Sequence, residues 1–373
     1  MKKQLLVINM IFLFGCLNSN QDAYKPVFEL KVIDSIVIKG YKPIFCANTQ
    51  NLFLFHDYFN GDISIYDTIT KTCTKFNKRG MGPGNYGAHV GFDGNITFLN
   101  DSIIAIGSGN HLILYDLMGN LINEIKFDSI TNIKNIHNLN NGKVLIFRSL
   151  SGDATSKSFY TEKQNMCVIF DTLRKTTIES IEFPSDSSIF PNSNFSYLHS
   201  FRHHSILLDN CLYLLNRNDP RILQYKIQNN NSLTELKLNN VLHLSLTNYN
   251  PLLREFNKLD NQQDGLNNFL QNGVITYFNI VNDTIYTEYV MGFTKDEIKE
   301  IYLKENIGDI RQKRFLNIQY KQNKITDDIP LNKRFSEIAF VANSKSFYLQ
   351  KEPNEFDESL QQQVFYKAEL INK

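Results

Sequence analysis

Residues 79–127 read RGMGPGNY (79–86), HVGFDGNITFLN (89–100), DSIIAIGSGN (101–110) and HLILYDLMGNLINEIKF (111–127). A glycine-rich turn is followed by four short runs of β-branched and aromatic residues, and Asn, Asp or Gly closes each run. Short strands separated by turn residues predict a four-stranded meander, which is the sequence pattern of one blade of a β-propeller.

The second half of this pattern recurs along the chain. Strand pairs that end in an aromatic and a polar residue occur at 52–57 with 62–67, 103–107 with 111–116, 144–148 with 166–171, 212–217 with 221–226, and 347–351 with 363–367. The aromatic anchors Tyr66, Tyr115, Phe170 and Tyr225 lie about 50 to 55 residues apart, within the range of propeller blades. The longer gap before Tyr366 fits two blades, and residues 275–280, 284–289 and 314–320 supply strands of the fifth.

We therefore predict an all-β fold, a single six-bladed β-propeller domain of four-stranded blades over residues 26–373. The run at 28–38 has no blade of its own and is expected to close the ring by pairing into the last blade. Short helical insertions are expected near blade five, at 251–259 and at 294–303, where Thr294 and Glu297 form a capping-box pattern. A seven-bladed ring and a pair of β-sandwiches are the competing architectures.

The N-terminal residues have the pattern of a targeting segment. Lys2 and Lys3 precede an apolar run at 5–14 that is too short to span a bilayer, and Leu13-Phe14-Gly15-Cys16 is similar to a bacterial lipobox. The interpretation is a lipoprotein signal peptide at 1–15, a lipid anchor on Cys16 and a polar tether at 16–25. An ordinary secretory signal is the alternative. The expected location is the cell envelope, lipid-anchored at the outer membrane, with a periplasmic or surface-facing orientation left open.

Four further cysteines, Cys46, Cys73, Cys167 and Cys211, lie in strand-like runs without CxxC or metal-type spacing. Buried free thiols are the favoured interpretation, and Cys46 with Cys73 is the one pair considered for a disulfide, since the envelope permits disulfides.

The turn at 80–86, followed by DGNITFLND (93–101) and LILYD (112–116), resembles the GxGPGEF turn and blade of NHL-like propellers. Together with the lipobox, the chain is similar to TolB-like six-bladed propeller lipoproteins of bacteroidetes. The resemblance implies a six-bladed ring and an envelope location, and that group has no common chemistry to transfer. Asn85 stands where Glu is usual, which puts in doubt any role of a carboxylate there.

Strand direction predicts which loops share one end of the ring. In a four-stranded meander, the loop after the second strand and the loop into the next blade lie at the same end. Polar and aromatic groups that converge there, around a central channel, form the default ligand site. The candidate ligand-binding residues are His56, Tyr58, Arg79, Tyr86, Arg148, Arg202, His203 and Arg217.

The sequence lacks the motifs that several classes of function require. A net charge of +1 gives no basic footprint for nucleic acid. The glycines at 80–84 are not followed by a Lys-Ser/Thr pair or by a helical pattern, which excludes a P-loop. No Gly-x-Ser-x-Gly elbow is present, and the cluster of His199, Arg202, His203 and His204 has no acidic partner at metal-ligand spacing. We predict no catalytic residue, no metal and no cofactor.

The expected function is that of a lipid-anchored binding module that presents one loop-rich face to a protein, peptide or glycan partner in the envelope. The alternative is a metal-dependent hydrolase or lyase of the propeller type, with its site at the central channel. A structural subunit of an outer-membrane assembly is a third possibility. The sequence leaves the oligomeric state open.

Overall fold

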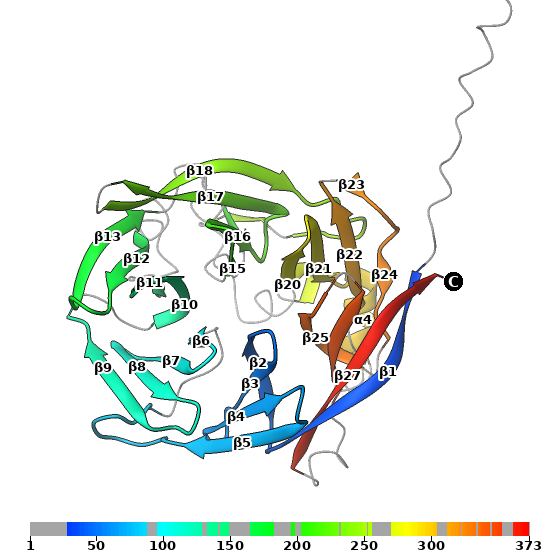
Figure 1. Ribbon diagram of the computed structural model, residues 1–373. Coiled ribbons are helices and arrows are strands. Elements are labelled where there is room, and N and C mark those ends of the chain that lie inside the picture. Colours follow the sequence, from blue (N-terminus) through cyan, green and yellow to red (C-terminus); the bar gives the residue numbers. More distant parts are fainter. Residues whose placement is uncertain are drawn as a thin grey trace, which may run out of the picture.

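The computed structural model describes residues 28–87, 95–128, 133–140, 142–148, 165–182, 195–197, 203–230, 233–251, 253–255, 270–303, 312–321, 323–332, 335–343, 345–352 and 361–372. Their strands form six antiparallel sheets of four or five strands that stand around a common centre, and one additional two-stranded sheet (Figure 1). The predicted six-bladed β-propeller is confirmed, and the seven-bladed and two-sandwich alternatives are wrong.

Each of the first five blades is a meander whose strands follow chain order. Blade 1 contains β2 (Pro43–Asn48), β3 (Leu52–Asp57), β4 (Asp62–Asp67) and β5 (Thr72–Asn77). Blade 2 contains β6 (Ile96–Asn100), β7 (Ile103–Ser108), β8 (His111–Asp116) and β9 (Leu121–Lys126). Blade 3 contains β10 (Ile133–Asn140), β11 (Lys143–Arg148), β12 (Asn165–Asp171) and β13 (Thr176–Glu182).

Blade 4 contains β15 (His203–Leu208), β16 (Cys211–Asn216), β17 (Arg221–Asn230) and β18 (Leu233–His243). Blade 5 contains β20 (Val274–Val281), β21 (Thr284–Val290), β22 (Arg314–Tyr320), β23 (Asn323–Lys324) and β24 (Ile329–Pro330), which pairs with β22. Blade 6 contains β25 (Phe335–Val341), β26 (Ser346–Lys351), β27 (Gln362–Asn372) and β1 (Phe28–Lys39). The recurring strand pairs of the sequence are the second and third strands of blades 1, 2, 3, 4 and 6.

An aspartate at the end of the third strand explains the repeated aromatic–Asp signature. Oδ1 of Asp67 accepts hydrogen bonds from the backbone N–H groups of Ile69 at 2.8 Å and Thr70 at 3.2 Å. Oδ1 of Asp171 accepts from Leu173 and Arg174, both at 2.9 Å. In such an Asx turn, the aspartate side chain accepts hydrogen bonds from backbone N–H groups that have no strand partner in the turn. The aspartate therefore sets the position of the turn.

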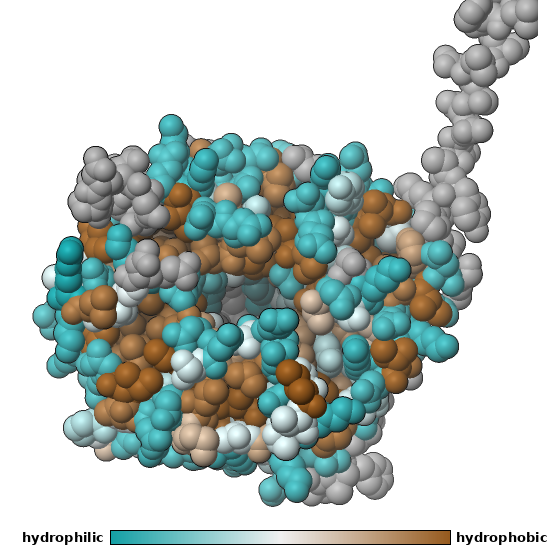
Figure 2. All heavy atoms as spheres, viewed as in Figure 1, coloured by the Kyte–Doolittle hydropathy of each residue, from teal (hydrophilic) through white to brown (hydrophobic). Residues whose placement is uncertain are grey.

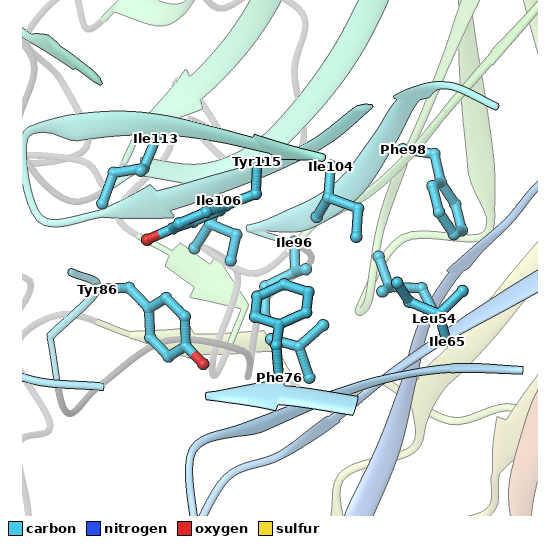
Figure 3. Close-up of a cluster of buried hydrophobic side chains, with 11 residues drawn as sticks. Leu54, Ile65, Phe76, Tyr86, Ile96, Phe98, Ile104, Ile106, Ile113 and Tyr115 are labelled. Atoms are coloured by element: carbon cyan, nitrogen blue, oxygen red, sulfur yellow. The ribbon is translucent and has the colours of Figure 1, made fainter. Parts of the chain in front are cut away.

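The glycine turn at 80–86 joins blade 1 to blade 2 and is built against their shared core (Figure 3). Gly84 has φ +69°, and a Cβ there would lie 2.8 Å from Cδ2 of Leu121, so a side chain is excluded. The hydroxyl of Tyr115 donates to the Gly84 carbonyl at 2.6 Å. The buried Tyr86 donates its hydroxyl to the Gly61 carbonyl at 2.5 Å. The glycines therefore serve a turn, as their spacing predicted.

The ring closes where β1 pairs with β27, from Phe28 opposite Asn372 to Lys39 opposite Gln362, with one register shift between Val32 and Asp34. The start of β1 and the end of β27 lie side by side at the outer rim of the ring (Figure 1). Ile36 and Ile38 of β1 pack in a cluster that includes Phe53 and Phe55 of blade 1 and Phe340 of blade 6. The predicted closure by an N-terminal strand is confirmed.

The two predicted helices have different outcomes. The helix at 294–303 is confirmed as α4 (Lys295–Leu303), in which Glu297 N donates to Thr294 Oγ1 at 3.2 Å and Thr294 N donates to Glu297 Oε2 at 2.8 Å. The helix at 251–259 is wrong at residues 253–255, which form strand β19 (Leu253–Glu255) and pair with β14 (Phe195–Tyr197). A nine-residue helical pattern is marginal alone, and a neighbouring chain with unpaired backbone groups overrides it. Residues 252 and 256–259 lie outside the described residues.

The four described cysteines are free. Cys167 is buried, and Cys46 and Cys211 are partly buried, but Cys73 is exposed, so the prediction of burial is wrong for Cys73. Cys46 and Cys73 lie on the innermost and outermost strands of blade 1, with β3 and β4 between them. Strands about 4.8 Å apart place β2 and β5 about 14 Å from each other, beyond the reach of a disulfide.

Residues 1–27, with the predicted signal peptide, Cys16 and the whole predicted tether, lie outside the described residues. Among the helices that the structure describes, none has the length and apolar character needed to cross a bilayer.

Ring closure generates a stability prediction from two neighbouring residues of β1. Ile38→Ala removes a fully buried side chain, so we expect it to lower the free energy of unfolding by about 2 to 5 kcal/mol. Val37→Ala, on the opposite face and 48% exposed, is expected to change it by less than about 0.5 kcal/mol. Urea unfolding of both variants measures the difference, and equal effects would contradict the assigned role of β1.

Candidate functional site at the mouth of the ring

Because neighbouring strands run in opposite directions, the same kinds of loop from every blade lie at one end of the ring. In blade 1, Pro43 at the start of β2 lies opposite Asp57 at the end of β3. The loop into each first strand and the loop after each second strand therefore share this end, which we name the mouth. The middle of the ring is hollowed, and polar residues border the hollow (Figure 2).

Asp57 fixes two mouth loops of blade 1 to each other. Its carboxylate is 2% exposed, and Oδ2 accepts from Tyr41 N at 2.6 Å and from Asn60 Nδ2 at 2.9 Å. Oδ1 accepts from Phe59 N at 3.1 Å and Asn60 N at 3.2 Å. A Cβ on Gly40 would lie 2.6 Å from Oδ2, so glycine is required where the loop before β2 approaches this carboxylate.

Three aromatic rings stand on the two loops that Asp57 holds. Tyr41 and Phe59 are 42% and 52% exposed, and their rings meet edge to face with centroids 4.9 Å apart. The partly buried Tyr58 meets Phe59 in the same way at 5.5 Å. Arg79 donates a hydrogen bond from Nη1 to the Phe59 carbonyl and so restrains the loop between β3 and β4. We name Tyr41, Tyr58 and Phe59 the aromatic platform.

A buried carboxylate joins blades 5 and 6 at the same end. Glu288 of β21 is completely buried, forms an ion pair with Arg314 of β22, and accepts a hydrogen bond at 2.8 Å from the backbone N–H of Ile338 in β25. Burial raises the pKa of Glu288, and the nearby Glu337 raises it further, against the opposing effects of Arg314 and the Ile338 N–H.

A second carboxylate, Glu337 of β25, extends this group toward blades 4 and 1. Burial raises the pKa of Glu337, and the positive charges of Arg314, Arg217 and Lys42 act in the opposite direction. Lys42 directly follows Tyr41 in the chain, so one loop supplies a residue to the aromatic platform and a residue to the charged group. We name Lys42, Arg217, Glu288, Arg314 and Glu337 the charge cluster; four blades contribute to it.

The arginines predicted as ligand residues are held by neighbouring backbone. Arg217 donates from Nε to the Ile275 carbonyl of blade 5 at 3.2 Å, and its own carbonyl accepts from the Tyr249 hydroxyl at 3.0 Å. Arg148, at the end of β11, donates from Nε to the Asn165 carbonyl within its own blade at 3.2 Å. Both side chains are partly exposed.

His56 and Tyr86 lie beneath the mouth, in the interface of blades 1 and 2. His56 is 2% exposed, its Nδ1 has no hydrogen-bond partner, and its ring meets Tyr86 edge to face at 6.4 Å. The Tyr86 hydroxyl also accepts from Lys78 N at 3.1 Å. Both side chains therefore pack under the platform, and we assign them a supporting role.

The predicted histidine–arginine cluster falls largely outside the described residues, which exclude His199 and Arg202. His203 and His204 lie in β15, the first strand of blade 4, and the His204 ring meets Phe278 edge to face at 6.4 Å. Over the described parts of the chain, no group of three or more His, Cys, Asp or Glu is placed to hold a metal ion.

The sequence pattern correctly predicted that Tyr58, Arg79, Arg148 and Arg217 lie at the mouth. It did not indicate five further residues there: Tyr41, Lys42, Phe59, Arg314 and Glu337. Tyr41 and Lys42 occupy the loop into blade 1, the same kind of loop as residues 79–86. Arg314 begins a third strand and Glu337 lies near the start of a first strand, positions that also reach the mouth. Counting strand beginnings together with loops would have found all five.

Comparison with known proteins shows the fold. No family model and no curated protein matches the chain. A member of the DUF4221 family from Bacteroides vulgatus is similar in structure with a TM-score of 0.59 and 12% identity, over 94% of this chain and 100% of that chain. A Bacteroides fragilis protein, named as a candidate exported protein, has a TM-score of 0.54 and 12% identity over 93% of this chain and 96% of that chain. At this identity, the likeness is one of architecture.

The buried His56 generates a pH prediction. Burial lowers the pKa of His56 to about 4, against 6.5 as its ordinary value, so the unfolded chain binds the proton first as the pH falls. This residue's contribution to stability is therefore lost as the pH falls from 6.5 towards 4, by about 2 kcal/mol at pH 5. We expect His56→Gln to lose less stability than the wild type between pH 7.5 and pH 5 in urea unfolding. The exposed His243→Gln serves as the control, and an unchanged pH dependence in His56→Gln would contradict the prediction.

Proposed function

We propose that the chain is a lipid-anchored cell-envelope protein that binds a partner molecule at the mouth of its propeller. The anchor is the acylated Cys16 of the lipobox-like segment. The mouth supplies an aromatic platform beside a charge cluster, and this juxtaposition of exposed rings and converging charged groups carries the proposal.

The energetics of the mouth fit a binding role. Solvent-exposed aromatic rings and carboxyl groups with raised pKa are unfavourable for the isolated fold, because apolar surface stays in water and charge is removed from it. Structures commonly retain such features where a ligand compensates for them.

The first strand of the ring, β1, begins far from the mouth, and the proposed tether precedes this strand in the chain. β1 begins at Phe28, beside Asn372, and runs twelve residues before it delivers Gly40 to the mouth. At about 3.3 Å per residue, the start of β1 lies up to about 40 Å from that loop. A lipid on Cys16 therefore leaves the mouth accessible to a partner.

A second candidate is a hydrolase or lyase that acts at the mouth. The observation that favours it is the pair of carboxyl groups with raised pKa, since a general acid must hold its proton near neutral pH. If the enzyme is metal-dependent, Ca²⁺ or Zn²⁺ should raise the melting temperature of the purified chain. Under the binding proposal, we expect no shift with either ion in a thermal-shift assay.

Site-specific photo-crosslinking in intact envelopes tests the binding proposal. A photoreactive amino acid replaces Phe59 at the mouth or, as the matched control, Leu173, which is 80% exposed in the turn between β12 and β13. We expect crosslinked species from position 59 and none from position 173. Crosslinks of equal yield from both positions, or none from position 59, would contradict the proposal.

A further inference from the structure

We propose that the ligand of the mouth is a neutral oligosaccharide. In this arrangement, the aromatic platform stacks on the apolar face of a sugar ring, and the charge cluster hydrogen-bonds to its hydroxyl groups. The inference rests on the proposed binding role of the mouth and names the chemical class of its ligand.

The exposed rings provide the first argument. The face of an aromatic ring carries partial negative charge, which attracts the slightly positive C–H groups on the flat side of a pyranose. Tyr41 and Phe59 keep about half of their surface in water although they contact each other, so ring area remains for a ligand. Tyr41 also carries a hydroxyl that can bond to a sugar.

The rigidity of the platform is the second argument. Asp57 accepts three hydrogen bonds from the backbone N–H groups of Tyr41, Phe59 and Asn60 and a fourth from the Asn60 side chain, and the Arg79 bond to the Phe59 carbonyl adds a further constraint. Aromatic side chains have only two rotatable bonds, and their loops are already ordered. Little conformational entropy is therefore lost when a weakly interacting ligand such as a sugar binds.

The balance of charge is the third argument. Arg314 forms an ion pair with Glu288 and also offsets the charge of Glu337, so the cluster holds cations and carboxyl groups side by side. A hydroxyl group both donates and accepts, so it is compatible with the cations and the carboxylate alike. A polyanionic ligand would instead meet carboxyl groups interspersed among the cations, and the chain's net charge of +1 gives no strong attracting field.

The same features argue against a peptide as the ligand. Peptide anchors bind in well-packed, desolvated pockets at the centre of an interface. Phe59 and Tyr41 instead project as exposed rings from loops, and the neighbouring cluster is ionic. A stacking surface beside mixed polar groups fits a ring-shaped, hydroxyl-rich ligand better.

Binding arrays test the inference with the full chain purified in detergent. One array carries neutral and acidic oligosaccharides and the other carries 15-residue peptides, and the strongest neutral oligosaccharide is then titrated calorimetrically. We expect Phe59→Ala and Tyr41→Ala each to weaken the Kd by about tenfold or more, the equivalent of about 1.4 kcal/mol. Phe59→Tyr, which keeps the ring, and Ile69→Ala, which truncates a 71% exposed residue at the opposite end of blade 1, should bind within about twofold of wild type.

Melting curves of each variant establish that it is folded. No binding of neutral oligosaccharides at millimolar concentration, binding of acidic ones alone, or an unchanged Kd in both Phe59→Ala and Tyr41→Ala would overturn the inference. Peptide binding that requires Phe59 would overturn the carbohydrate assignment and leave the mouth as a binding face. A failure of the photo-crosslinking at position 59 would remove the proposed function itself.

Discussion

The pairing of β1 with β27 is the interaction on which the remaining structure depends. It joins the first described strand to the last, supplies the outermost strand of blade 6, and removes edges that would otherwise remain unpaired. Ile36 and Ile38 connect this strand to both blade 6 and blade 1, so closure also buries the core between the first and last blades. Because β1 runs directly into the loop before β2, the same pairing delivers Gly40, Tyr41 and Lys42 to the mouth.

The structure of the mouth therefore depends on ring closure as well as on the individual blades. Tyr41 reaches Phe59 because Asp57 holds both loops, and the charge of Lys42 acts on Glu337 because blade 6 lies next to blade 1. Glu288 connects blade 5 to the first strand of blade 6 through Ile338. The side chains that stack or carry charge are thus held by a second set of buried groups, which is the arrangement expected of a binding site.

Local signals predicted the fold well, because a propeller repeats one short unit. Asp67, Asp116 and Asp171 mark the same turn in three blades, and Thr294 with Glu297 marks a helix start; each signal acts within a few residues. The errors came from long-range contacts. Residues 253–255 pair with a strand almost sixty positions earlier, and Cys73 is exposed on β5, the outermost strand of blade 1. The charge cluster was not predicted as a group, since Lys42, Arg217, Arg314 and Glu337 come from four different blades and Lys42 joins the others only when the ring closes.

Native-state hydrogen exchange of Ile38→Ala tests most directly whether closure builds the mouth. We expect backbone amides of β1, β27 and the residues held by Asp57 (Tyr41, Phe59 and Asn60) to lose protection together, while the strands of blade 4 keep theirs. Loss of protection in β1 and β27 with unchanged protection of Tyr41, Phe59 and Asn60 would contradict this expectation.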